Sequence, residues 1–253
     1  MKPTIQTSSS KKSSVKSWPR PEAGVTLAAV SMIVDMGIQN RPDFVDQTGK
    51  KVPRKPVQQL AVLVDLLTQT HDWGGDIGTK QIRLPLYNTF EGQVLGHDFV
   101  VYKQEDGVVT FNPKSKMAKL TSACGATKEL IANGHDVEAL LGKALMVEVT
   151  EREYNGNFYH KIKGVMPVMK GLPIPKLEAA PIIVAFETCT EEQAKLIRSD
   201  VRKQIMKANN YQGSTIQKVF VKMGFDENGI DAPPAKKQEV ETPFDGIEED
   251  CPF

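Results

Sequence analysis

Basic and aromatic side chains gather in two stretches of this 253-residue chain. The first is the turn-rich segment 41–56, whose basic residues are Lys50, Lys51, Arg54 and Lys55. The second spans 143–163 and contains Lys143, Arg152, Tyr154, Phe158, Tyr159, Lys161 and Lys163. Cations at this density can neutralise a row of phosphates, and aromatic rings can stack on bases. Together the two stretches predict a binding site for a single nucleic-acid strand.

Each of these positions also has a plainer interpretation. The cations of 41–56 either contact phosphate, which we favour, or only face solvent. Alternation along a strand sends either Phe158 or Tyr159 into the core. Since Lys161 and Lys163 share the Tyr159 face, we expect Tyr159 to be the stacking ring. Trp73, in the Gly-rich "HDWGGDIG", is either a stacking platform at a loop tip or a lid on the end of a barrel.

Signals for catalysis, metals or cofactors are weak. His71, Asp72 and Asp76 lie too close together in one Gly-rich loop to resemble a known metal site. The three cysteines lack Cys-x-x-Cys or Cys/His spacing, and Cys124 belongs to no nucleophile signature, so a buried structural role is expected for it. No phosphate-binding GxxxxGK or GxGxxG is present. We therefore expect a protein that is not an enzyme and uses no metal and no cofactor.

The hydrophobic pattern predicts mainly strands before residue 170. Segment 24–40 is dense in β-branched and small apolar residues, which is typical of a largely buried strand. Segment 57–69 is compatible with a helix, but its valines favour a strand. Shorter strands are expected within 80–90 and 97–113.

Local signals fix the later elements. Asp136 and Gly142 bracket a short helix. Asn155-Gly156 provides the two positive-φ residues of a type I′ turn, so 143–168 should be a β-hairpin. Thr190 and Gln193 can form a capping box that opens one amphipathic helix over 190–209.

Charge is distributed unevenly along the chain. Residues 226–253 hold nine acids and two lysines, whereas the other 225 residues hold thirty basic and twenty-two acidic groups. A basic body with an acidic tail is typical of a polyanion-binding surface that carries a tethered competitor, and equally of a solubilising appendage. The tip has the acids and the apolar end expected of a partner-binding tail: Asp245, Glu248, Glu249, Asp250, Pro252 and Phe253.

Two parts of the chain carry a family resemblance. "GVTLAAVSMIVDMGIQN", "LLGKALMVEVTEREYNGNFYHKIKGVMPV" and "APIIVAFETCTEEQAKLIRSDVRKQIMKANNY" resemble phage-encoded replication proteins with an OB-fold that bind single-stranded DNA. "DGIEEDCPF" is similar to the acidic tip of bacterial and phage single-stranded DNA-binding proteins, with a cysteine where an aliphatic residue is usual. The first resemblance covers most of residues 24–211, by pattern more than by identity.

Pattern and resemblance together imply a mainly β protein with α additions. The expected parts are a flexible basic arm (1–22), an OB-fold-like Greek-key barrel that binds DNA (23–170), a Pro-rich connection with a helical extension (171–224) and a disordered acidic tail (225–253).

The expected function follows from the same features. The protein would coat single-stranded DNA during phage replication and recombination, in the cytoplasm of the infected bacterium. Its tail would recruit a polymerase, helicase or primase, and a homo-oligomer is compatible with this role. No apolar run approaches eighteen residues, so no membrane span is expected. The alternative is an annealing accessory or a nucleic-acid-processing enzyme.

Overall fold

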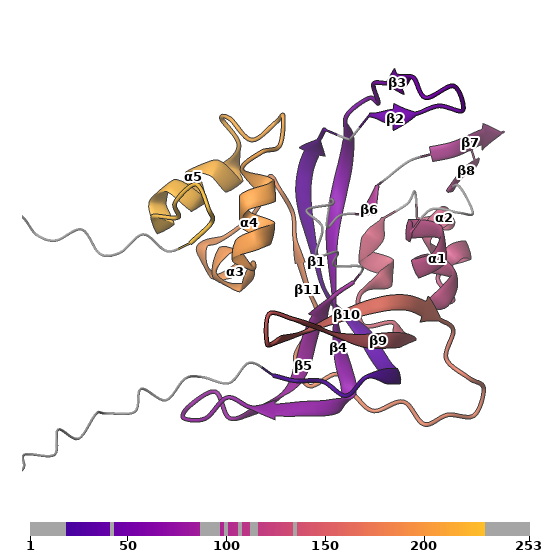
Figure 1. The fold of residues 1–253 in the computed structure, drawn as a ribbon, viewed down its shortest axis with the longest axis vertical. Helices are drawn as coiled ribbons and strands as arrows, with labels where there is room; N and C mark the ends of the chain where they lie inside the picture. The colour runs from indigo at the N-terminus through magenta and orange to yellow at the C-terminus, as the bar shows by residue number, and fades with distance from the viewer. Residues whose placement is uncertain are drawn as a thin grey trace, which may run out of the picture.

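The fold is built on one large, mostly antiparallel sheet. The computed structural model describes residues 19–40, 43–86, 97–98, 101–105, 108–111, 116–133 and 136–230. The main sheet has the strand order β10-β9-β1-β4-β5, with β6 antiparallel to β4 and β11 parallel to β1 (Figure 1). Its strands are β1 (Gly24–Gln39), β4 (Val57–Asp72), β5 (Thr79–Pro85), β6 (His97–Asp98), β9 (Ala144–Tyr154), β10 (Asn157–Met166) and β11 (Ile182–Val184).

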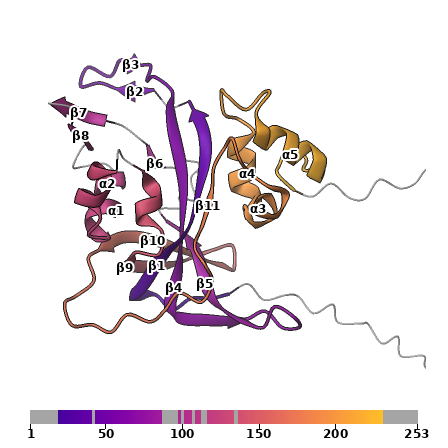
Figure 2. The ribbon, with the colours of Figure 1, turned by 180° about the vertical axis from the view of Figure 1, so that it is seen from behind.

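Small sheets and helices complete the structure. Two two-stranded sheets lie outside the main one: β2 (Phe44–Val45) with β3 (Lys51–Val52), and β7 (Val101–Glu105) with β8 (Val108–Phe111). The helices are α1 (Lys116–Ala123), α2 (Thr127–Ala132), the 3₁₀ helix η1 (Val137–Leu140), α3 (Glu191–Leu196), α4 (Ser199–Ile205) and α5 (Thr215–Met223). Figures 1 and 2 show α1 and α2 on one side of β1 and β4, and α3–α5 on the other.

Because β1 and β4 are covered on both sides, their sequences are almost wholly apolar. One core lies between these strands, α1, α2, η1 and the β9–β10 hairpin. A second core lies between the same strands and the helical unit, by which we mean α3, α4 and α5. Strands covered on both faces read as continuous hydrophobic runs. The buried strand expected at 24–40 and the strand preferred at 57–69 are therefore confirmed.

A β-bulge in β1 interrupts the alternation of side chains between the two faces of the strand. Strict alternation would place Ala28, Val30, Met32 and Val34 on one face. The pairing of β1 with β4 shifts register between Val30 and Met32. Ala28 and Val30 consequently face the first core, while Met32 and Val34 face the second.

The bulge residue Ser31 begins a buried polar network. Its hydroxyl donates to Asp65 Oδ1 at 2.6 Å, and the Arg83 guanidinium donates to both Asp65 oxygens at 2.7 and 3.0 Å. Asp65 is buried and Arg83 is partly exposed. Because the carboxylate accepts from both neighbours, the network lets a polar residue occupy a strand centre.

The β9–β10 hairpin forms as the sequence predicts. Asn155 and Gly156 adopt φ values of 51° and 73°, as a type I′ turn requires. The returning strand places Ile162 in the core, and a register shift between Ile162 and Gly164 makes Lys163 the extra residue of a bulge. The buried Ile162 thus marks the core-facing side of β10, from which the orientation of the other hairpin residues follows.

The expected single helix over 190–209 is instead two helices. Thr190 and Gln193 do form the capping box, but the chain is extended at Ile197 and Arg198, between α3 and α4. The buried guanidinium of Arg202 donates to carbonyl oxygens at the end of α3, which satisfies acceptors that a continuous helix would use internally. The short helix expected near Asp136 is the 3₁₀ helix η1, with Asp136 as its N-cap.

The fold class is mainly β with a few helices. Six strands of the main sheet are antiparallel, and the sheet is not closed, because its path of paired strands ends at β10 and at β5. Residues 1–18 of the predicted arm and 231–253 of the predicted tail lie outside the described residues. The predicted tip, from Asp245 to Phe253, is among them.

Candidate nucleic-acid interface

The β2–β3 hairpin projects beyond the main sheet where β1 ends and β4 begins (Figures 1 and 2). The sequence places it in the connection 40–56, and its strands pair Phe44 with Val52 and Val45 with Lys51. Phe44 is 46 % exposed, although an aromatic ring is usually covered. The Arg54 guanidinium lies 5.2 Å from the ring centroid, within cation–π range. The hairpin thus presents an aromatic face beside a cation.

All four predicted cations of this hairpin are exposed, namely Lys50, Lys51, Arg54 and Lys55. The nearest acid along the chain, Asp46, is engaged in the turn. Its carboxylate accepts hydrogen bonds from the Thr48 hydroxyl at 2.6 Å and from the Thr48 and Lys50 amides at 2.8 and 3.0 Å, which lower the pKa of Asp46. Within the described residues, no acid pairs with Lys50, Lys51 or Arg54. A polyanion could therefore bind these three cations without displacing an acidic partner.

The cations of the β9–β10 hairpin are more compensated than the sequence suggests. Lys143 donates to Glu129 of α2 at 2.8 Å, and Lys163 donates to Glu148 at 3.4 Å. Arg152 is exposed. Counting basic residues overlooked the acids of β9, although Glu148, Glu151 and Glu153 are all visible in its sequence.

The two faces of β10 differ as expected from alternation. Tyr159 and Lys161 are half-buried and lie on the face opposite the buried Ile162. Phe158 lies on the Ile162 side near the turn, yet its side chain is 43 % exposed. The Tyr154 side chain lies outside what the structure describes. The hairpin tip therefore exposes Phe158 more than Tyr159, whereas the sequence favoured Tyr159 as the stacking ring.

An arginine that the sequence had placed in the flexible arm contacts Phe158. Arg20 donates to the two Glu151 oxygens at 2.8 and 3.0 Å, and its guanidinium carbon lies 3.7 Å from the Phe158 ring centroid. Hydrogen bonding to Arg20, followed by that to His160, lowers the pKa of Glu151. No local signal connects Arg20 with Glu151, because 131 residues separate them.

Trp73 lies in the turn between β4 and β5, half-buried against His71. The two rings meet edge-on, with centroids 4.9 Å apart. This turn is at the opposite end of β4 from the β2–β3 hairpin (Figure 1). Since β4 has sixteen residues, its length is at most about 50 Å at about 3.3 Å per residue. The predicted site residues thus lie in separate hairpins, with Trp73 and the β2–β3 hairpin at opposite ends of β4.

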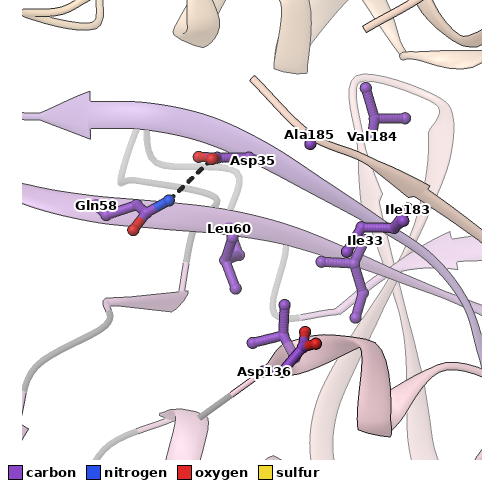
Figure 3. A pocket seen from close by; sticks show the side chains of 9 residues that line it. Ile33, Asp35, Gln58, Leu60, Asp136, Ile183, Val184 and Ala185 are labelled. Carbon is purple, nitrogen blue, oxygen red and sulfur yellow. Dashed lines mark hydrogen bonds between the residues drawn. The ribbon is translucent and has the colours of Figure 1, made fainter. Parts of the chain in front are cut away.

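A separate pocket of about 240 Å³ lies between β1, β4, β11 and the start of η1 (Figure 3). Its walls are mostly apolar, including Ile33 and Leu60, and its carboxylates are Asp35 and Asp136. Burial raises the pKa of Asp35, although the Gly37 amide and the Gln58 side chain donate to it, each at 2.8 Å. None of these pocket residues belongs to a motif that marks a site in the sequence.

The described residues contain no group of three or more His, Cys, Asp or Glu side chains placed to hold a metal ion, the His71–Asp76 loop included. Burial raises the pKa of Cys124 to about 12 and that of Cys189 to about 11, so both are thiols at neutral pH. Cys124 is partly buried, close to the structural role expected for it.

The last described residues belong to the start of the predicted tail. Phe225 packs edge-on against Phe220, with ring centroids 5.3 Å apart. The Arg202 guanidinium lies 3.8 Å from the ring centroid of Phe225. Asp226 closes a turn by accepting from the Ile230 amide at 2.9 Å. The structure therefore describes six residues, Phe225 to Ile230, beyond the boundary that composition indicates.

No known protein family matches the chain, and no curated protein sequence matches it. None of the described helices has the length and apolar character needed to cross a membrane. The sheet, its hairpins and their charges are therefore the basis for a functional proposal.

Proposed function

We propose that this protein is a non-catalytic single-stranded DNA-binding protein. The observation that carries the proposal is the β2–β3 hairpin, which exposes four cations and the Phe44 ring on an arm that projects from the sheet. Phosphates need spaced cations, and unpaired bases need an aromatic face. Asp46 is engaged within the turn and no described acid pairs with Lys50, Lys51 or Arg54, which leaves these three cations available to a polyanion.

The main sheet is compatible with an OB-fold, which we propose as the finer fold class. An OB-fold is a partly open, five-stranded Greek-key barrel that binds oligonucleotides with the loops after its first and fourth strands. If β1, β4, β5, β9 and β10 are those five strands, the β2–β3 hairpin lies in the first loop. The turn Asn155–Gly156 is then the second loop. The first basic stretch would then lie in one of the loops that this fold class uses, and the second would flank the other.

The wider role rests on the resemblance described above. The protein would coat single-stranded DNA during phage replication and recombination in the bacterial cytoplasm, and its acidic tip would recruit replication proteins. The basic body and the acidic tail support this division of labour, because a strand of DNA can displace a tethered tail of like charge.

The test is a fluorescence-anisotropy titration of the full chain against labelled oligo-dT, with a duplex of equal length as the comparison. We expect saturable binding to oligo-dT that exceeds binding to the duplex and weakens with salt. Equal affinity for both DNAs, or no binding at low salt, would reject the proposal. Incubation of the labelled oligonucleotide with Mg²⁺ and the protein should leave its length unchanged, and shortening would indicate a nuclease instead.

A further inference from the structure

A short segment at the start of the described chain, which we call the strap, contacts both the β9–β10 hairpin and strand β4. Its sequence is Pro19-Arg20-Pro21-Glu22. A residue before proline is restricted to extended backbone, so Arg20 is held extended before any contact forms. Pro21 is buried, and the Glu22 amide donates to the Gln69 side chain of β4 at 2.8 Å. The strap therefore runs from the β9–β10 hairpin to β4.

The Arg20 side chain is fixed from two directions. Glu151 of β9 accepts two hydrogen bonds from its guanidinium, at 2.8 and 3.0 Å, and is itself 2.9 Å from His160 Nε2. The guanidinium also lies over the Phe158 ring, 3.7 Å from its centroid. A planar cation thus covers one face of a ring near the tip of an exposed hairpin.

The covered ring has the properties of a base-stacking platform. A guanidinium and a nucleobase are both planar groups that stack on aromatic faces, so they compete for the same surface. Phe158 remains 43 % exposed beside this cover. Its cross-strand neighbour is Glu153, whereas Arg152 pairs with Tyr159 and lies on the opposite face of the hairpin. A base in a duplex is stacked and paired, so only an unpaired base can readily take the guanidinium's place.

We propose that Phe158 is a base-stacking site that Arg20 covers in the DNA-free protein, and that an unpaired base replaces the guanidinium on the ring. The inference rests on the proposed function and adds a selective site to it. The exchange makes the strap a part of the DNA-binding surface.

The first experiment keeps the charge and removes the cover. Arg20→Lys preserves the cation but can neither stack as a plane nor donate two parallel hydrogen bonds. The matched control is Arg198→Lys, which makes the same change in an exposed arginine that donates twice to Asp200 on the helical unit. We expect Arg20→Lys to tighten oligo-dT binding by a factor of a few, and Arg198→Lys to leave it unchanged. No tightening by Arg20→Lys would overturn the covering role.

The second experiment locates the base. Full-length protein is irradiated with oligo-dT that carries one 5-iododeoxyuridine, and the adducts are mapped by mass spectrometry. We expect an adduct at Phe158, with a higher yield in Arg20→Lys than in the wild type. Phe158→Leu should lose it and weaken binding by about 5- to 150-fold, the loss of one base–aromatic stack.

The outcomes separate this inference from the proposed function. Tight oligo-dT binding without an adduct at Phe158 overturns the stacking site and leaves the proposed function standing. Equal adduct yields in the wild type and Arg20→Lys overturn the cover alone. Absence of oligo-dT binding by the folded wild type overturns both. A melting curve for each variant shows that the compared proteins are folded.

Discussion

Neutralising the β2–β3 hairpin should change the salt dependence of DNA binding by a calculable amount. The variant replaces four residues with glutamine: Lys50, Lys51, Arg54 and Lys55. Because all four side chains are exposed, the fold should be retained. Each phosphate contacted on a single strand contributes about −0.7 to the slope of log K against log[salt]. If each of the four cations meets one phosphate, the slope should become shallower by about 2.8.

The same arithmetic gives the loss of affinity. If counterion release is the whole contribution of these cations, the wild type and the variant bind DNA equally at about 1 M salt. Below that concentration their plots of log K against log[salt] diverge. At about 0.1 M salt the variant should then bind roughly 600-fold more weakly. Anisotropy titrations of labelled oligo-dT across a NaCl series measure both quantities.

The control must remove equal charge elsewhere. Four exposed lysines of the helical unit serve this purpose when changed together to glutamine: Lys195, Lys207, Lys218 and Lys222. We expect this control to keep the wild-type slope, because local phosphate contacts set it. If both variants flatten the slope equally, only net charge matters and the β2–β3 hairpin is not the binding site.

Three further predictions concern stability and are measured by urea denaturation. Asp65→Ala strips an acceptor from two partners in the core and should cost about 3 kcal/mol, against about 0–1 kcal/mol for Asp200→Ala in its exposed pair. Gly37→Ala should cost roughly 2–5 kcal/mol, because the φ of Gly37 is positive and the new Cβ would lie 2.6 Å from a ring carbon of Phe186. The control Gly171→Ala also has a positive φ but lies in open space, so it should cost only about 1–2 kcal/mol. Burial raises the pKa of Asp35 above 3.8, so the folded state holds that proton more tightly and stability should fall as pH rises through the raised value. Asp35→Asn should remove this fall, and an unchanged pH profile would contradict the assignment.

Features specified by neighbouring residues could be predicted from the sequence. The type I′ turn at Asn155–Gly156 needs only two residues that tolerate positive φ, and both are adjacent. The capping box of Thr190 and Gln193 joins groups three residues apart. The buried strand at 24–40 followed from its composition, since only a strand covered on both faces is apolar throughout. The exposed cations of the β2–β3 hairpin followed from its turn-rich sequence.

Features that depend on distant partners could not be predicted. The bulge at Ser31 exchanges the two faces of β1, and its hydroxyl is held by Asp65, 34 residues away. The break between α3 and α4 is held by Arg202, whose guanidinium also donates to the Gly229 carbonyl, 27 residues along. Neither partner is marked in the local pattern, because each becomes a neighbour only after the chain has folded.

The candidate site shows the same difference between local features and contacts of distant residues. The sequence by itself determined which residues are cationic or aromatic, that 143–168 forms a hairpin and that 41–56 is rich in turn residues. Only the tertiary structure decided which of these charges have internal partners, such as Lys143 with Glu129, and that Arg20 covers Phe158. The physical reason is that a turn or a cap is closed by hydrogen bonds within a few residues, whereas an ion pair or a ring contact requires two strands or helices to be brought together by the cores they share.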